Sequence, residues 1–254
     1  MRLSLISMAI AASLALPGAA SADGFDPKKM SAEEREAFRG EVREYLLENP
    51  EVIFEAIQIL EERRKNASAA ADRDLVAANA EAIFNDGHSW SSDNDAADIT
   101  IVEFLDYRCG YCKRAHPEVE ELLERDPKVK VIVKEFPILG PDSVKAGRMA
   151  LAALALDPGK YRALNDALMA HKGNLTEATA YQVAAGVGYD IAQLKERAES
   201  QTISDKLNKN YQLAQTLGLQ GTPAYIIGKQ IIRGYLPVDD LLAVVAEERA
   251  EASN

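Results

Sequence analysis

The 254 residues contain only two cysteines, and these stand three positions apart in the Cys-Gly-Tyr-Cys stretch at residues 109–112. The preceding residues 99–105 are mostly apolar and β-branched and predict a strand, whereas residues 113–125 predict a helix. The pair therefore lies at a strand-to-helix junction. One pair cannot provide a disulfide framework for a chain of this length, so the pattern favours a chemical over a structural role.

The first residues have the pattern of a secretory signal peptide. Arg2 precedes an apolar run at residues 3–16 and a small-residue site at 20–22, so cleavage is expected after Ala22. The alternative, a membrane anchor, is disfavoured because the apolar run is too short. We expect export to the periplasm, where disulfides persist.

Losing this segment takes the net charge from −11 to −12, because it contains Arg2 and no acid. Such an acidic chain is not expected to bind nucleic acid or an anionic membrane surface.

We expect three parts in the chain: a signal peptide at 1–22, an N-terminal helical oligomerisation region and linker at 23–97, and a catalytic domain at 98–254. Ser31 and Glu34 form a capping-box pattern that predicts the start of the first helix. The turn-rich residues 85–98 indicate the boundary before the catalytic domain.

The N-terminal region predicts long helices. Asn49 and Pro50 predict a break, with Asn49 as the N-cap of the next helix. No glycine or proline interrupts residues 51–86, which predicts one continuous helix. The apolar face between Phe38 and Leu60 has no nearby partner in sequence. It favours a stalk or oligomer helix over the alternative, a set of shorter helices packed on the catalytic domain.

The second part of the chain predicts an α/β domain. The elements expected are a strand at 99–105, a helix at 113–125, a strand at 129–136, several helices between 142 and 217, a hairpin at 224–233 and a last helix from Pro237. A strand–helix–strand unit implies parallel pairing. This order predicts a thioredoxin-like sheet with a helical subdomain inserted at about 141–218.

The cysteine pair allows three interpretations. At the N-terminus of a helix, Cys109 should have a lowered pKa and act as the attacking thiolate, with Cys112 resolving the mixed disulfide. Half of a zinc site would need two further ligands, and only His88, His116 and His171 are good candidates. An inert structural disulfide is the third possibility. The redox pair is favoured, and neither a metal nor a cofactor is expected.

Two further features support the redox interpretation. Thr222-Pro223 directly precedes the hairpin, and in thioredoxin-like proteins a cis-proline at this point lies beside the dithiol. Glu103 stands in an apolar strand, where a carboxylate is costly unless it has a role. It could accept the proton of Cys112, with Lys134 as a possible charge partner. The alternatives are an ordinary trans proline and a solvated edge glutamate. His116 is expected to lie on a helix face rather than to act as a catalyst.

Residues 103–113 together with Thr222-Pro223 resemble the DsbA family of thiol–disulfide oxidoreductases, and the resemblance covers about 99–247. It implies a thioredoxin fold with a helical insertion, a nucleophilic Cys109, a resolving Cys112, a cis-Pro223 and a buried acid at Glu103. Thr222, Pro223, Gly110 and Tyr111 would contact substrate.

Two departures shift the expected activity. The Gly110-Tyr111 pair is similar to that of DsbC-type isomerases, not to the Pro-His pair of the strong oxidase DsbA, and Thr222 also fits that group. Residues 46–53 resemble the N-terminal domain of ScsC-like (suppressor of copper sensitivity) proteins, which implies a homo-oligomer, with a trimer favoured.

The resemblance implies a periplasmic disulfide isomerase or reductase that acts on exported proteins. A membrane thiol reductase of the ScsB/DsbD type would keep it reduced. The alternatives are a monomeric DsbA-like oxidase and a Cu(I)-binding copper-tolerance protein, because two adjacent thiolates suit Cu(I).

Overall fold

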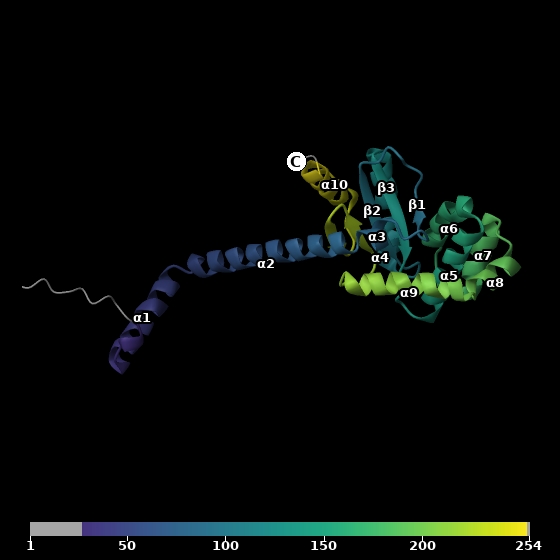
Figure 1. Cartoon of the computed structure of the whole chain (residues 1–254). Helices are drawn as coiled ribbons and strands as arrows, with labels where there is room; N and C mark the ends of the chain where they lie inside the picture. The colour runs from purple at the N-terminus through teal and green to yellow at the C-terminus, as the bar shows by residue number, and fades with distance from the viewer. Residues whose placement is uncertain (1–26, 253–254) are drawn as a thin grey trace, which may run out of the picture. The chain divides into compact units, whose positions relative to one another are not determined.

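The structure is a computed structural model that describes residues 27–252, so the predicted cleavage site at Ala22 lies outside the described residues. By internal packing the chain divides after Leu60 into a smaller N-terminal unit and a larger unit. The helix α2 (Glu51–Ala78) belongs partly to each (Figure 1). Each unit is described in turn.

The smaller unit contains the short 3-10 helix η1 (Pro27–Lys29), α1 (Ala32–Glu48) and the first turns of α2. The predicted capping box is present at the start of α1. The hydroxyl of Ser31 accepts the backbone N–H of Glu34, and the Glu34 carboxylate accepts the N–H of Ser31. Two N–H groups that the first turn leaves unpaired are thereby satisfied.

Asn49 caps the end of α1 rather than the start of α2. Its side-chain amide and its backbone N–H both donate to the carbonyl of Tyr45, each at 2.9 Å. The expected N-cap role is therefore wrong, because the preceding helix already uses this side chain. The continuous helix expected over 51–86 ends early as well. It stops at Ala78, where the Asn79 amide donates to the Leu75 carbonyl, and α3 (Ala80–Phe84) follows.

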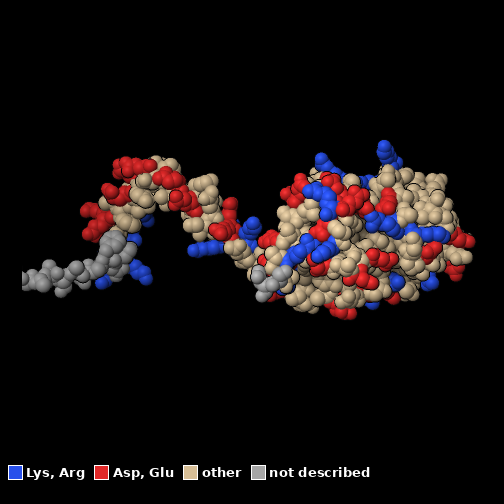
Figure 2. Space-filling view, turned by 90° about the horizontal axis from the view of Figure 1, so that it is seen from above, with Lys and Arg blue, Asp and Glu red and all other residues tan. Residues whose placement is uncertain are grey.

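The described part of the smaller unit exposes its large apolar side chains. No residue of α1 is buried, and exposure ranges from 42% to 64%. The residues are Phe38, Val42, Tyr45 and Leu47 on α1, and Ile53, Phe54, Ile57, Ile59 and Leu60 on α2. Acidic side chains are also frequent along this unit, whereas both signs are interspersed on the visible face of the larger unit (Figure 2).

Within residues 27–252, no helix is both long and apolar enough to cross a membrane.

The larger unit is built on a five-stranded sheet with the order β1-β3-β2-β4-β5. The strands are β1 (Trp90–Ser91), β2 (Ile99–Leu105), β3 (Val129–Glu135), β4 (Ala224–Ile227) and β5 (Gln230–Arg233). β2 and β3 pair in parallel, as the sequence predicted, and the other pairs are antiparallel. The short β1 lies within the stretch that the sequence indicated as a linker.

Helices cover both faces of the sheet (Figure 1). They are α4 (Gly110–Arg125), α5 (Pro141–Leu156), α6 (Pro158–Ala170), α7 (Glu177–Val187), α8 (Ile191–Ala198), α9 (Gln201–Thr216) and α10 (Val238–Ala252). Alternate residues of β2 point to opposite faces. Ile101 and Leu105 pack in a cluster with α4, α10 and the inserted helices α5–α8. Val102 and Phe104 pack in the other cluster, with α9 and α3.

Part of the expected oligomerisation region and linker, residues 23–97, packs with the larger unit. Val76 and Ile83 are buried in the cluster with Val102 and Phe104, although both precede residue 97. The Asp72 carboxylate also accepts two hydrogen bonds at 2.8 Å from the Arg233 guanidinium on β5. Residues 61–97 therefore pack as part of the larger unit.

Candidate active site

The first cysteine lies at the start of a helix. Cys109 is the N-cap residue of α4, and its N–H donates to the carbonyl of Asp106 at 3.0 Å. The buried Asp106 carboxylate accepts the backbone N–H groups of Arg108, Ile138 and Leu139 and the hydroxyl of Ser143. These four bonds fix the turn between β2 and α4. Cys109 is thereby held where free N–H groups and the helix dipole favour an anion.

The two thiols have opposite electrostatic environments. A hydrogen bond from Cys112 lowers the pKa of Cys109 to about 5, although partial burial opposes the shift. The same bond, together with burial, raises the pKa of Cys112. Cys112 is fully buried on α4 and Cys109 is 7% exposed. Cys109 can therefore carry the thiolate while Cys112 keeps its proton.

The proline loop lies against the dithiol, although it is more than 100 residues away in sequence. The Thr222–Pro223 peptide bond is cis, as the sequence predicted. The Cys109 thiol lies 3.2 Å from the Thr222 carbonyl oxygen, to which it can donate. The Pro223 carbonyl accepts the N–H of Gly234 at the end of the hairpin. Chain folding thus brings the two predicted motifs into direct contact.

Glu103 is buried beneath the active-site helix. It is 3% exposed and belongs to the face of β2 that α4 covers, because it pairs with Val133 of β3. Burial raises the pKa of Glu103 to about 7, with His116 opposing the shift and Glu120 adding to it. Glu103 in turn contributes to the raised pKa of Cys112. A carboxyl that titrates near neutral pH can exchange a proton with a thiol.

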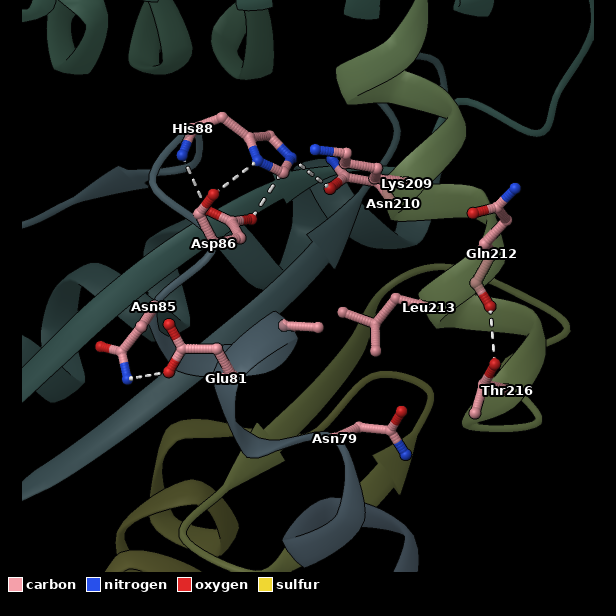
Figure 3. A pocket seen from close by; sticks show the side chains of 11 residues that line it. Asn79, Glu81, Asn85, Asp86, His88, Lys209, Asn210, Gln212, Leu213 and Thr216 are labelled. Atoms are coloured by element: carbon pink, nitrogen blue, oxygen red, sulfur yellow. Dashed lines mark hydrogen bonds and ion pairs between the residues drawn. The ribbon is translucent and has the colours of Figure 1, made fainter.

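Lys134 is not the partner of Glu103, and that suggestion was wrong. The register aligns Lys134 with Phe104, so its side chain is on the opposite face of the sheet. There the buried ammonium group forms an ion pair with Asp86. Figure 3 shows the cleft that Asp86 lines, where His88 reaches both Asp86 and Asn210. One residue of register decides which face a strand side chain occupies, and the sequence alone did not fix it.

The two residues between the cysteines, Gly110 and Tyr111, shape the surface beside Cys109. Tyr111 is 61% exposed, and its ring centroid lies 6.5 Å from that of Tyr235. The Arg114 guanidinium lies 5.3 Å from the Tyr235 ring centroid. Apart from its two chain neighbours and the backbone of its own helix, no heavy atom would lie within 4 Å of a Cβ at Gly110. The surface beside Cys109 is thus aromatic and open.

The histidines do not complete a metal site with the cysteines among the described residues. His88 lies on the other face of the sheet, and His116 is 3.1 Å from Asp166. Among the described residues, one group of possible metal ligands lies close together: His116, Glu120 and Asp166. The Arg162 guanidinium already forms ion pairs with both acids of this group. The position of His116 on the α4 face agrees with the sequence analysis.

The sequence analysis did not find a second buried acid on the same face. Glu135 accepts the hydroxyls of Tyr107 and Tyr161, each at 2.7 Å. Burial raises the pKa of Glu135 to about 8, although both tyrosine hydrogen bonds lower it. The sequence did contain a signal, because Glu135 ends the largely apolar strand β3 just as Glu103 interrupts β2. Its tyrosine partners come from distant segments that no local pattern connects.

A family model described as "DSBA-like thioredoxin domain" matches residues 100–246, which is more than half of the chain. The chain belongs to the DsbA-like thioredoxin family. A second model, "Copper resistance protein ScsC N-terminal domain", matches residues 34–67. The family consists of thiol–disulfide oxidoreductases with an α/β thioredoxin-like fold, in agreement with the geometry described above.

Solved structures of this family resemble the chain. A thioredoxin-like oxidoreductase from Silicibacter pomeroyi is 36% identical, with a TM-score of 0.64, over 67% of this chain and 97% of its own. A linker-deletion variant of Proteus mirabilis ScsC is 30% identical, with a TM-score of 0.65, over 88% of this chain and 98% of its own. The second match therefore extends beyond the catalytic unit.

Matches to curated proteins include much longer chains. A sodium–proton antiporter NhaA of Salinispora tropica is 24% identical over 156 residues, which is 61% of this chain. The chain spans only 24% of the length of that relative. The antiporter activity of the whole relative is therefore not assigned to this chain.

Proposed function

We propose that this protein is a periplasmic thiol–disulfide isomerase or reductase that acts on exported proteins through Cys109 and Cys112. The observation that carries the proposal is the unequal dithiol. Cys109 has a lowered pKa beside cis-Pro223, and Cys112 is buried with a raised pKa. A nucleophile that is largely ionised at neutral pH, next to a thiol that is not, suits an exchange reaction in two steps.

In the first step the Cys109 thiolate attacks a substrate disulfide. A Cys109–substrate bond forms, the substrate disulfide breaks, and one substrate sulfur leaves as a thiolate. For isomerisation, another substrate thiolate then attacks the mixed disulfide and releases Cys109.

For reduction, Cys112 attacks Cys109 instead. Glu103 takes the proton of Cys112, a Cys109–Cys112 disulfide forms, and the substrate leaves reduced. A membrane thiol reductase of the ScsB/DsbD type then returns two electrons to the pair.

The substrate chain would lie across the proline loop. The Thr222 backbone, which lies beside the Cys109 thiol, would pair in a strand-like way with an extended peptide. Gly110 leaves room beside Cys109, and the exposed Tyr111 adds apolar surface next to it. Open and apolar contacts suit misfolded chains of varied sequence better than one defined partner.

The N-terminal region would hold several active sites together. The match of residues 34–67 to the ScsC N-terminal domain and the exposed apolar face between Phe38 and Leu60 support a homo-oligomer, with a trimer favoured. We further propose cleavage after Ala22, with residues 23–97 serving as oligomerisation region and linker and residues 98–254 as catalytic domain. Residues 61–97, which belong to the larger unit, would form the linker. An isomerase gains from this arrangement because one misfolded chain can meet more than one dithiol.

Refolding of a scrambled multi-disulfide protein tests the proposal. The reduced mature protein should restore the native activity of the scrambled substrate, and a Cys109→Ala variant should not. An oxidase would instead speed disulfide formation in a reduced substrate without unscrambling the wrong pairs. If the wild type unscrambles nothing, the isomerase proposal fails.

Cu(I) binding is the second candidate, and the match to a copper-resistance domain family favours it. Two neighbouring thiols suit Cu(I). Competition with a coloured Cu(I) chelator measures the affinity. Tight binding that disappears in the Cys112→Ser variant would support this function. If the chelator keeps all of the Cu(I) in the presence of the wild-type protein, this function is excluded.

A further inference from the structure

A buried tyrosine lies directly opposite Glu103. β2 and β4 are antiparallel, and their register pairs Glu103 with Tyr225, two residues after cis-Pro223. Side chains of directly paired residues stand on the same face of a sheet, with Cβ atoms about 5 Å apart. Tyr225 is fully buried in the cluster that contains both cysteines.

The hydroxyl of this tyrosine has no partner in the described structure. Within residues 27–252, no group forms a hydrogen bond with the Tyr225 hydroxyl, and Glu103 Oε1 is likewise buried without one. A buried hydroxyl normally finds an acceptor, and an unpaired one costs about 1–3 kcal/mol. Phenylalanine would fill the same space without that cost. Two unpaired polar atoms on directly paired residues therefore suggest a bond in a different charge state of the site.

The charges around Tyr225 identify that state. Burial raises the pKa of the Tyr225 phenol, and the charges of Glu103, Cys112 and Cys109 raise it further. The phenol therefore remains a neutral hydrogen-bond donor. On the paired strand, Glu103 is the group that must be an anion before it can accept the proton of Cys112. The carboxylate accepts hydrogen bonds more strongly than the neutral acid does.

We propose that Tyr225 is a positioning residue for the resolving step, and that its hydroxyl donates a hydrogen bond to the Glu103 carboxylate that takes the proton of Cys112. The inference rests on the proposed dithiol chemistry. In that step the S–H bond of Cys112 breaks and its proton passes to Glu103. The sulfur of Cys112 bonds to Cys109, and the substrate leaves as a thiolate. Tyr225 keeps its own proton throughout.

Other groups also act on Glu103 and enter the pH dependence. On α4 these are Cys112, His116 and Glu120, and on β3 it is Glu135. His116 is the cationic member of this set. Burial lowers its pKa, but the hydrogen bond to Asp166 and the nearby carboxylates together outweigh burial and raise the pKa. Removing the Tyr225 hydroxyl leaves all of these groups in place. The change therefore isolates one donor.

The test is the Tyr225→Phe variant in the mature full-length chain. The probe is the mixed disulfide of Cys109 with glutathione, and the measurement is the rate at which Cys112 releases glutathione as a function of pH. We expect the midpoint of the profile to rise by about one pH unit, with up to about tenfold slower release near neutral pH. The thiolate titration of Cys109 in the free enzyme should not move.

Two controls separate this role from a structural one. Tyr211→Phe removes a half-buried hydroxyl that donates to the Pro137 carbonyl, and it should leave the profile unchanged. In a Glu103→Gln background, adding Tyr225→Phe should have no further effect. An unshifted profile in Tyr225→Phe, or an equal loss with and without Glu103, would overturn the inference. If the wild-type mixed disulfide is never resolved, the proposed dithiol function fails instead.

Discussion

The dithiol site and the N-terminal helices differ in where their side chains find contacts. Around Cys109 the polar contacts are internal: Asp106 fixes the turn and Thr222 approaches the sulfur. Between Phe38 and Leu60, apolar side chains remain exposed. In the first region, one chain supplies both thiols and the groups that surround them. The second has an apolar face that a single chain leaves in water, which is what an interface between copies would cover.

Substitutions in the two regions should therefore affect different properties: disulfide exchange in one case and the oligomeric state in the other. The Cys109→Ser variant should lose all disulfide exchange, because the remaining thiol, Cys112, is fully buried and has a raised pKa. Its oligomeric state by light scattering should equal that of the wild type. Residual isomerase activity in this variant would contradict the assignment of Cys109, and a changed mass would show that the regions are not independent.

A charge in the apolar face should have the opposite effect. Ile57→Glu places a carboxylate among Phe54, Ile53 and Leu60, and an interface cannot bury it unpaired. We expect a monomer by light scattering, a large loss of unscrambling activity, and unchanged reduction of glutathione disulfide. Asn66→Glu is the matched control. At 3.6 residues per turn, residue 66 lies on the opposite side of α2 from residue 57, so this change should have no effect. A wild-type monomer at micromolar concentration would refute the oligomer proposal.

The third prediction concerns the buried acid Glu135 and the pH dependence of the free energy of unfolding. The pKa of Glu135 is raised above its unfolded value, so its stabilising contribution is complete below about pH 4.5 and is lost as pH rises through about 8. This group alone should lower the free energy of unfolding by about 1.4 kcal/mol per pH unit in that interval.

The Glu135→Gln variant should lose that slope, because the amide stays neutral and still accepts the hydroxyls of Tyr107 and Tyr161. Urea unfolding at several pH values measures the difference. Parallel pH dependences of wild type and variant would show that Glu135 does not titrate in this range. Tyr211→Phe again serves as a control that should keep the wild-type slope.

Local patterns were enough to predict much of the fold and of the site. Alternating and β-branched residues located β2, β3 and the hairpin, and the cysteine pair marked the start of α4. The capping box at Ser31 was predicted for the same reason, since both of its bonds are local. Thr222-Pro223 required the fold resemblance, because nothing local distinguishes a cis from a trans proline.

What sequence reasoning missed depends on register and on distant partners. Lys134 was placed near Glu103, but one residue of register moves it to the other face, where Asp86 pairs with it. The helix end at Ala78 was missed as well, where the Asn79 side chain caps the Leu75 carbonyl and Val76 is buried in the cluster with Val102 and Phe104. Glu135 and Tyr225 were missed for the same reason, since their neighbours come from other strands and helices.

The most direct test of the central claim is a titration of the Cys109 thiolate by its ultraviolet absorbance in the reduced protein, with the Cys109→Ser variant as the blank. An unequal dithiol predicts a single transition with a midpoint near pH 5, and no second thiolate below the alkaline range. A midpoint near about 8.5, the value of an ordinary cysteine, would contradict the account.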